Sequence, residues 1–270
     1  MDQFVCVRLV QGNALDLSLF QFDYDLTFAA FLMNADKTIY GRFGSRSDRK
    51  DAAKDISMEG FGKALTAALE LHKGYPGNKA LLAGKQSRPP RFKSPEEYPS
   101  LAGKYKPTLD YEGKVVQSCM HCHQIRDAEL TFFRAEKKPI PTEVLYAWPM
   151  PNVTGLTMDP KEMATVRAVA EHSAAAKAGF QAGDEIVALE DQPLLSTADL
   201  QWVLQHAGEN ATLKAEVLRG KKKINLSLTL DKDWRWKTDI SWRATTWDLR
   251  RMAAGGLVLE DLPDAERRRA

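Results

Sequence analysis

The sequence predicts an α/β part followed by a mostly-β part, with an extended stretch carrying a C-x-x-C-H motif between them. Up to about residue 85, short apolar β-branched runs accompany one strongly amphipathic stretch. A proline-rich stretch without periodicity follows. Alternating strand patterns with glycine turns then begin near residue 152. We therefore divide the chain into residues 1–85, 86–151, 152–232 and a tail at 233–270.

Composition is that of a globular protein and favours no particular partner. The chain has 270 residues, enough for two domains, with 44% hydrophobic and 27% charged residues. The net charge of +2 indicates neither nucleic acid nor an acidic surface. No apolar run approaches the ~18 residues of a membrane span, so we predict no transmembrane segment.

The first residues, MDQFVCVRLV, lack the basic and apolar regions of a signal peptide. They start directly on an apolar, β-branched run. We therefore hypothesise that the sequence is truncated at its start, with export signals upstream, and that the protein is extracytoplasmic or periplasmic.

Residues 4–43 predict strands and one short helix. Phe4 to Val10 reads as a buried strand, which would make Cys6 a buried and inert thiol. Asn13 is placed to cap a short helix over residues 15–20. Residues 26–33 and 38–43 read as two strands joined by the turn Asn34–Ala35–Asp36.

Residues 57–74 predict an amphipathic helix. Ser57 is placed to cap it, Gly74 to close it, and one face is apolar. His72 lies on that stripe, four residues after Ala68. A packed histidine, or one stabilised by the helix C-terminus, is the first interpretation; a metal or haem ligand is the second.

The order strand, helix, hairpin, helix, with LTFAAFLMNADKTIYGRFG, resembles the second half of a thioredoxin-like fold over about 70 residues. The family's active-site CxxC would lie before residue 1, and Thr27–Phe28 stand where the family has a cis-proline. The resemblance therefore implies a structural α/β layer, with a redox domain lacking its catalytic part as the alternative. No thioredoxin catalytic residue carries over.

The motif C-M-H-C-H at residues 119–123 carries the chemistry. Two thiols three positions apart, followed by an imidazole, suit haem c: Cys119 and Cys122 would each take a vinyl group and His123 one face of the iron. Half a zinc site, completed from elsewhere, is one alternative. A thiol oxidoreductase using the two cysteines is another.

GKVVQSCMHCHQI resembles the first helix of small c-type cytochromes, which implies thioether positions at Cys119 and Cys122 and a proximal ligand at His123. The segment is too short for a whole cytochrome domain. Met150 is the first candidate for the distal ligand, although packing between modules also explains it. His72 and His121 are the next candidates.

Residues 152–232 give the firmest prediction. A strand at 165–170, the run HSAAAKAGFQAGDEIVALEDQPL, a helix capped by Ser196, and strands at 212–218 and 224–230 follow in order. Gly179 and Gly183 suit turn conformations that a Cβ would hinder. This run resembles the bacterial PDZ domains of periplasmic trypsin-like proteases, which implies a β-barrel-like domain that binds a protein or peptide C-terminus.

The PDZ resemblance implies a carboxylate-binding loop at Gly155, Leu156, Thr157 and Met158. The helix residues Leu200, Val203 and Leu204 supply either the peptide groove or the core, and their spacing does not separate the two. No G-x-S-x-G motif occurs, so the sequence does not indicate a protease.

The tail interleaves aromatic and basic residues, with Trp234, Trp236, Trp242 and Trp247 beside Arg235, Arg243, Arg250 and Arg251. We expect its rings to pack on the rest of the chain and its arginines to pair with carboxylates. A partner interface is the alternative. The whole sequence thus indicates a non-catalytic protein in which a PDZ domain recruits a partner beside a haem c site, with a PDZ scaffold holding zinc or no cofactor as the alternative.

Overall fold

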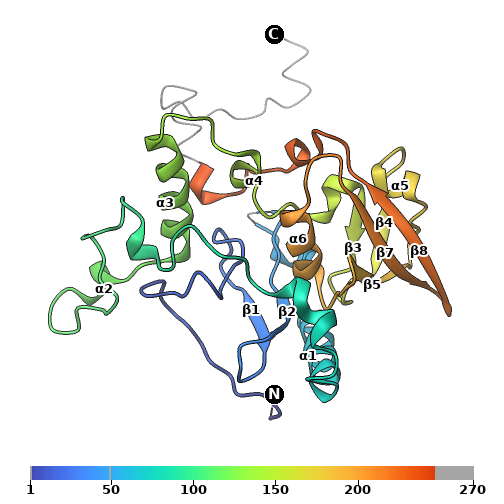
Figure 1. Ribbon diagram of the computed structural model, residues 1–270, viewed down its shortest axis with the longest axis horizontal. Coiled ribbons are helices and arrows are strands. Elements are labelled where there is room, and N and C mark those ends of the chain that lie inside the picture. Colours follow the sequence, from blue (N-terminus) through green and yellow to red (C-terminus); the bar gives the residue numbers. More distant parts are fainter. Residues whose placement is uncertain (1, 49, 247–270) are drawn as a thin grey trace, which may run out of the picture.

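The computed structural model describes residues 2–48 and 50–246, and it combines helices with small antiparallel sheets (Figure 1). Figure 1 shows the PDZ region at one end, with β7 and β8 as a long ribbon, and helix α3 at the other. Helix α6 lies between this ribbon and the strands β1 and β2.

The N-terminal part contains one hairpin and one long helix. Strands β1 (Ala30–Met33) and β2 (Ile39–Phe43) pair antiparallel, and α1 (Met58–Lys73) follows. Ser57 caps α1 by accepting a hydrogen bond from the Gly60 N–H, and Gly74 is the C-cap, so both predicted ends are confirmed. Three short 3₁₀ helices accompany them: η1 (Ala52–Lys54), η2 (Lys79–Lys85) and η3 (Pro95–Glu97).

The predicted first strand is wrong. Residues 4–10 form no strand, the side chains of Val5 and Val7 are 94% and 79% exposed, and Cys6 is exposed. An apolar β-branched run becomes a buried strand only where a neighbouring strand or layer covers it. The sheet of β1 and β2 has two strands, and within the described residues it offers this run no partner. A thioredoxin layer is therefore not confirmed.

The predicted helix over residues 15–20 is also absent. The Asn13 side chain does not cap a local helix. Its amide donates to the backbone oxygens of Lys106 and Ser118, and its Oδ1 accepts from the Met120 N–H at 2.8 Å. Asn13 thus holds the loop that contains the C-x-x-C-H motif.

Residues 86–151 are not extended throughout. Helices α2 (Val115–Ser118), α3 (Cys122–Ala135) and α4 (Thr142–Leu145) form here. Their core includes residues from the N-terminal part, so the predicted boundary at residue 85 does not separate two cores. The buried members are Leu15, Leu17, Tyr98, Leu101, Tyr105, Met120, Ile125 and Ala128.

The C-terminal part contains two open sheets. Strands β3 (Leu156–Met158) and β4 (Val166–Val169) pair, and the second sheet has the order β6-β5-β7-β8. Its strands are β5 (Glu185–Leu189), β6 (Gln192–Pro193), β7 (Thr212–Arg219) and β8 (Lys222–Thr229). The predicted barrel-like closure is wrong for the described chain, which shows no closed barrel.

Two helices cover these sheets, and the cap predicted at Ser196 is confirmed. Ser173 caps α5 (Ala174–Ala178), and Ser196 caps α6 (Thr197–His206). Gly179 and Gly183 have φ values of +89° and +88°, the left-handed region that the sequence predicts for them. The remaining 3₁₀ helices are η4 (Pro151–Thr154), η5 (Trp234–Lys237) and η6 (Ala244–Thr246).

The tail packs back onto the chain as predicted. Trp234 is 1% exposed and belongs to the PDZ core, and Arg243 is buried against Asp23 and Asp25. Trp236 is the exception, because it stays 64% exposed beside Tyr146. Trp247, Arg250 and Arg251 lie outside the described residues.

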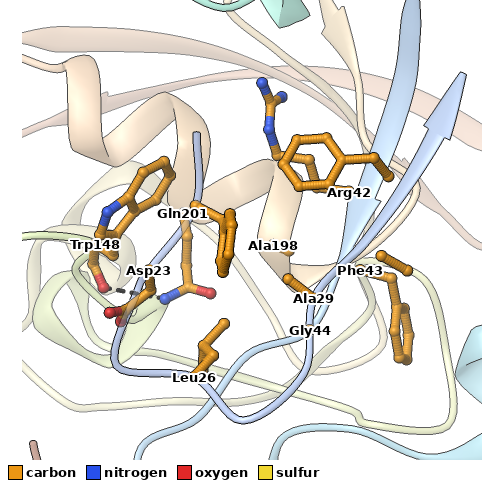
Figure 2. A pocket seen from close by; sticks show the side chains of 12 residues that line it. Asp23, Leu26, Ala29, Arg42, Phe43, Gly44, Trp148, Ala198 and Gln201 are labelled. Carbon is orange, nitrogen blue, oxygen red and sulfur yellow. Dashed lines mark hydrogen bonds between the residues drawn. The ribbon is translucent and has the colours of Figure 1, made fainter. Parts of the chain in front are cut away.

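Helix α6 joins the two parts through a buried ion pair. Lys85 Nζ lies 2.8 Å from the Asp199 carboxylate, and both side chains are almost fully buried. The Arg42 guanidinium stacks over the Trp202 ring at 3.6 Å. Figure 2 shows a pocket beside Arg42, lined by Ala198 and Gln201 of α6 and by Leu26, Ala29 and Phe43 of the N-terminal part.

We predict that Lys85→Met destabilises the protein by about 3–5 kcal/mol, because it leaves the Asp199 charge buried without its partner. Urea unfolding measures the loss. Lys79→Met, at the exposed start of the same 3₁₀ helix, is the control and should change stability by less than about 0.5 kcal/mol. Equal effects of the two substitutions would contradict the role of this pair.

Candidate functional site

The C-x-x-C-H motif bridges two helices. Cys119 is the C-cap of α2, Met120 is fully buried, and Cys122 is the first residue of α3. Besides Asn13, the backbone of Gly12 holds the loop, because its N–H donates to the Met120 carbonyl at 2.7 Å. The motif is therefore fixed by residues more than 100 positions earlier in the chain.

Both motif cysteines are free thiols and partly buried. Burial raises the pKa of the Cys122 thiol above its ordinary value. A raised pKa keeps the group protonated near neutral pH, so Cys122 is a weak nucleophile as the chain stands.

His123 faces a buried carboxylate. Its Nδ1 lies 3.6 Å from Asp25 Oδ1, which is within ion-pair range but longer than a direct hydrogen bond. The Nδ1 atom is buried without a hydrogen-bond partner, while the side chain as a whole remains 40% exposed. The Asp25 carboxylate raises the pKa of His123.

Asp25 is held by groups from two other segments, α3 and the tail. Burial by itself raises the pKa of this carboxyl, but His123, Arg243 and Thr245 outweigh it and lower the pKa to about 2. Thr245 Oγ1 donates to Asp25 Oδ2 at 2.9 Å. Arg243 Nη1 donates to Asp23 at 2.5 Å and reaches Asp25 at 3.3 Å. Arg243 Nη2 donates to the Ala147 carbonyl, which ties residues 23–25, the tail and the approach to the PDZ part together.

A cavity of about 220 Å³ lies along α3. Arg126, Glu129 and Phe133 line it, and they share one helical stripe with Cys122 at spacings of four, three and four residues. Tyr24 lines the same cavity. Aromatic rings and two arginines, Arg91 and Arg126, thus surround open space on the side of α3 that carries Cys122.

The predicted distal ligands belong to three different elements. The His72 ring accepts or donates a hydrogen bond with Tyr40 Oη at 2.8 Å, and Figure 1 shows α1 and α3 well apart. Met150 caps η4, with its carbonyl bonded to the Val153 N–H. His121 is the exposed N-cap of α3. Within residues 2–48 and 50–246, no three His, Cys, Asp or Glu side chains are grouped so as to hold a metal ion.

Of the four residues predicted as the carboxylate loop, only Gly155 precedes β3, and the other three form the strand. Gly155 has φ +94°, and a Cβ there would collide with the Ser173 side chain. Only glycine suits this position. Leu156, Thr157 and Met158 form β3, whose Leu156 and Met158 side chains enter the PDZ core.

One edge of β3 faces β4 and the other does not. The Gly155 carbonyl accepts from the Ala170 N–H, and the Asp159 N–H donates to the Thr165 carbonyl. Alternation along the strand therefore directs the backbone groups of Leu156 and Met158 to the opposite edge. Within the described chain, no backbone hydrogen bond from another segment reaches that edge.

Helix α6 contributes its apolar side chains to the core. Leu200, Val203 and Leu204 are 1%, 5% and 0% exposed within the PDZ core. The sequence left open whether these residues line the peptide groove or the core, and the structure places them in the core. A direct peptide contact by these three residues stays a prediction.

Sequence reasoning missed Asn13 as a loop anchor, and it missed Asp23 and Asp25 altogether. Their partners lie roughly one hundred or more positions away in the chain. The acidic pair in Asp23–Tyr24–Asp25 was the one available signal, because two carboxylates so close to an apolar stretch need cationic partners when buried.

We predict that acid sensitivity of the haem-free protein depends on Asp25. A lowered carboxyl pKa stabilises the fold above the ordinary pKa near 4, and this stability is lost as the pH falls through 4 towards 2. Wild type should lose about 2 kcal/mol more unfolding free energy between pH 5 and pH 2 than Asp25→Asn. Asp127→Asn, in α3, is the control and should retain the wild-type profile. Parallel profiles for wild type and Asp25→Asn would contradict this account.

Comparison with known proteins concerns the C-terminal part. Residues 151–230 match the PDZ domain family, against a predicted range of 152–232. A protein of Pseudomonas putida (strain W619) named "Probable periplasmic serine endoprotease DegP-like" is 36% identical over 73 residues, which is 27% of this chain and 15% of that protein. A protein of Synechocystis sp. (strain ATCC 27184 / PCC 6803 / Kazusa) named "Putative serine protease HhoA" is 39% identical over 54 residues, which is 20% of this chain and 14% of that protein.

A solved structure of an HtrA-type protease with a decapeptide is 14% identical, with a TM-score of 0.27, and the match covers 42% of this chain and 35% of that one. The chain thus spans about a seventh of the length of the two curated relatives. The described residues contain no helix that is both long and apolar enough to cross a membrane. Residues 151–230 form a bacterial PDZ domain, a peptide-binding module with relatives among DegP-like proteins.

Proposed function

We propose that this chain is a non-catalytic adaptor whose PDZ domain binds the C-terminal end of a partner protein along β3. The open edge of β3 carries this proposal. An added strand satisfies the backbone groups of Leu156 and Met158. The Gly155 N–H is bonded to the Asn152 carbonyl, so the Leu156 N–H that follows the turn is the backbone donor for a terminal carboxylate. Backbone pairing supplies affinity in this mode, and side-chain pockets supply selectivity.

The proposed location is extracytoplasmic. One relative of the PDZ domain is named as periplasmic. The attachment of haem c also takes place outside the cytoplasm, so this location suits both proposed activities. The protease activity named for the relatives is not part of this proposal, because those matches span only 27% and 20% of this chain.

A second proposed activity is a haem c site at the motif, which would serve electron transfer or redox sensing. Cys119 and Cys122 would hold the group through thioethers, and His123 would bind the iron. The observation that favours it is the buried, unpaired Nδ1 of His123 beside Asp25. A ligand histidine ordinarily turns one ring N–H towards a carboxylate or carbonyl and leaves the other nitrogen for the metal. When bound, haem supplies one-electron chemistry; Asp25 fixes the orientation of the ring.

The two alternatives for the motif, a zinc site and a thiol oxidoreductase, find less support than haem c. A zinc site needs four ligands, and the described residues bring no three suitable side chains together. A thiol oxidoreductase needs a thiol of lowered pKa, whereas burial raises that of Cys122. Met150 remains the first candidate for a distal ligand. It is partly buried, and it lies three residues after Ala147, whose carbonyl accepts a hydrogen bond from Arg243.

We predict that the protein binds peptides through a free C-terminal carboxylate. A ligand selected from a C-terminally randomised peptide library should lose at least about tenfold in affinity when its C-terminus is amidated, equal to about 1.4 kcal/mol. Fluorescence anisotropy measures both peptides on the unaltered protein. Gly155→Asp does not serve as the test, because a side chain there meets Ser173 and disturbs the fold. Equal binding of the acid and the amide would contradict carboxylate capture.

We predict covalent haem when the chain is exported in a host with haem c maturation machinery. The purified protein should show a Soret band that survives denaturation. Cys119→Ser and Cys122→Ser together should abolish it, because no thioether forms. Cys6→Ser is the control, since Cys6 is exposed outside the motif and should leave the band unchanged. A colourless wild-type protein from such a host would contradict the haem proposal.

A further inference from the structure

The cavity along α3 lies where the three parts of the chain meet. Its lining side chains come from α3, from α4 and the residues just after it, from α6 of the PDZ domain, and from residues 17–24 and 90–98. In the view of Figure 1, α4 lies between α3 and α6. Junctions of this kind are common places for small-molecule sites. Neither His123 nor a residue of β3 is among the described side chains that line the cavity.

The cavity has the size and the walls of a site for one small aromatic molecule. Its volume of about 220 Å³ lies below the roughly 300–1,000 Å³ of sites for drug-sized ligands, so it suits a molecule of one or two rings. Phe132 and Phe133 line it from α3, and Trp148 and Trp202, whose rings lie 6.0 Å apart, line it beside α6. Aromatic rings pack favourably against such neighbours in offset or edge-on arrangements.

The two acidic residues that line the cavity already have cations near them. Glu129 pairs with Arg126, whose Nη2 donates to the Val144 carbonyl. Glu143 lies close enough to Arg235 for its charge to oppose the lowering of the Arg235 pKa that burial causes. The cavity therefore offers little free negative charge to a cationic ligand.

Arg91, by contrast, has no carboxylate partner among residues 2–48 and 50–246. Its guanidinium lies over the Phe132 and Phe133 rings, 5.0 and 5.5 Å from their centroids. Because this side chain is exposed and also lines the cavity, it stands at the rim. Arginine binds carboxylates with a geometry that suits their planar shape, so the rim presents an unpaired charge to an anionic group.

Tyr98 adds an unused hydroxyl close to Arg91. The side chain is 8% exposed, and its hydroxyl makes no hydrogen bond within the described chain. Burial raises the pKa of Tyr98, and the charge of Glu129 adds to the rise. The charges of Arg126 and Arg91 oppose it, so the hydroxyl lies near residues that line the cavity. A buried hydroxyl without a partner is costly, and a ligand carboxylate would supply the missing acceptor.

The α6 end of the cavity is neutral and has arginines around it. His206 Nδ1 lies 2.8 Å from the Trp202 carbonyl, and because a carbonyl only accepts, this nitrogen carries the proton. Burial lowers the pKa of His206 to about 4, and three nearby arginines add to the lowering: Arg88, Arg42 and Arg235. The ring is therefore uncharged near neutral pH, while the charges around it favour an anion over a cation.

We infer that this cavity is a binding site for a small aromatic carboxylate. The ring of the ligand packs among the aromatic side chains, and its carboxylate binds Arg91 and accepts a hydrogen bond from the Tyr98 hydroxyl. This activity goes beyond the proposed peptide binding and haem attachment, because it depends on neither of them.

The test compares aromatic acids with their neutral amides on the unaltered full chain. The probes are benzoate, phenylacetate and indole-3-acetate, each beside its amide, and titration calorimetry measures binding. At least one acid should bind with a dissociation constant of about a millimolar or below, as expected for ligands of this size. Its amide should bind at least about tenfold more weakly, since it brings no charge to Arg91.

Two variants and a control locate the site. Tyr98→Phe keeps the ring, so the affinity for the acid should fall about tenfold while the free energy of unfolding stays at or above the wild-type value, because the lost hydroxyl has no partner in the free protein. Arg91→Gln should weaken the acid about tenfold and remove its advantage over the amide. Lys93→Gln removes an exposed cation that does not line the cavity, and it should bind as wild type does.

Each outcome decides for or against the site. Absence of binding by all three acids overturns it, and so does equal binding of the acids and their amides. Acid binding that Arg91→Gln and Tyr98→Phe both leave unchanged also overturns it, because the ligand then binds elsewhere on the chain. If a variant does not fold, the comparison of acids with amides in wild type decides.

Discussion

The buried carboxylate of Asp199 is the point on which the arrangement of the two parts depends. Its Oδ1 accepts from the Arg42 N–H at 3.1 Å, and its Oδ2 accepts from the Leu195 N–H at 2.9 Å and pairs with Lys85. One partner belongs to the PDZ domain and two to the N-terminal part. A charge this deeply buried is tolerable only when all of these partners are present. The N-terminal part and α6 therefore stabilise each other, and neither presents this surface to water in the folded chain.

Arg243 makes a second junction of the same kind. It joins the carboxylates of Asp23 and Asp25 to the Ala147 carbonyl, which lies more than 100 positions further along the sequence. Through Asp25 this junction reaches His123, so the surroundings of the motif come from the N-terminal part and the tail. The motif is consequently part of a small helical core with Leu15 and Leu17, and not an insert held on an extended linker. Its chemistry therefore depends on residues that lie far from the cysteines in the sequence.

Local signals in the sequence predicted local structure well. The predicted caps Ser57 and Ser196 each accept a hydrogen bond from the first turn of their helix, because a cap needs only residues within a few positions. The glycine turns at Gly179 and Gly183 likewise follow from backbone sterics alone. The failures depend on distant partners. Residues 4–10 have a strand pattern but no strand beside them, and Asn13 bonds remote backbone instead of a local helix end. The buried cations Lys85 and Arg42 could not be predicted, since most lysines and arginines lie at the surface.

The packing around the C-x-x-C-H motif also affects which chemistry the motif can perform. A dithiol catalyst needs a stabilised thiolate, and the partly buried Cys122 has instead a raised pKa. A ligand histidine needs one nitrogen turned to a fixed acceptor, and Asp25 is such an acceptor, kept ionised by Arg243 and Thr245. Both features come from burying the start of α3 against residues 23–25. The packing that disfavours thiol chemistry at Cys122 is thus the packing that orients His123, and this coupling favours an attached cofactor over a redox disulfide.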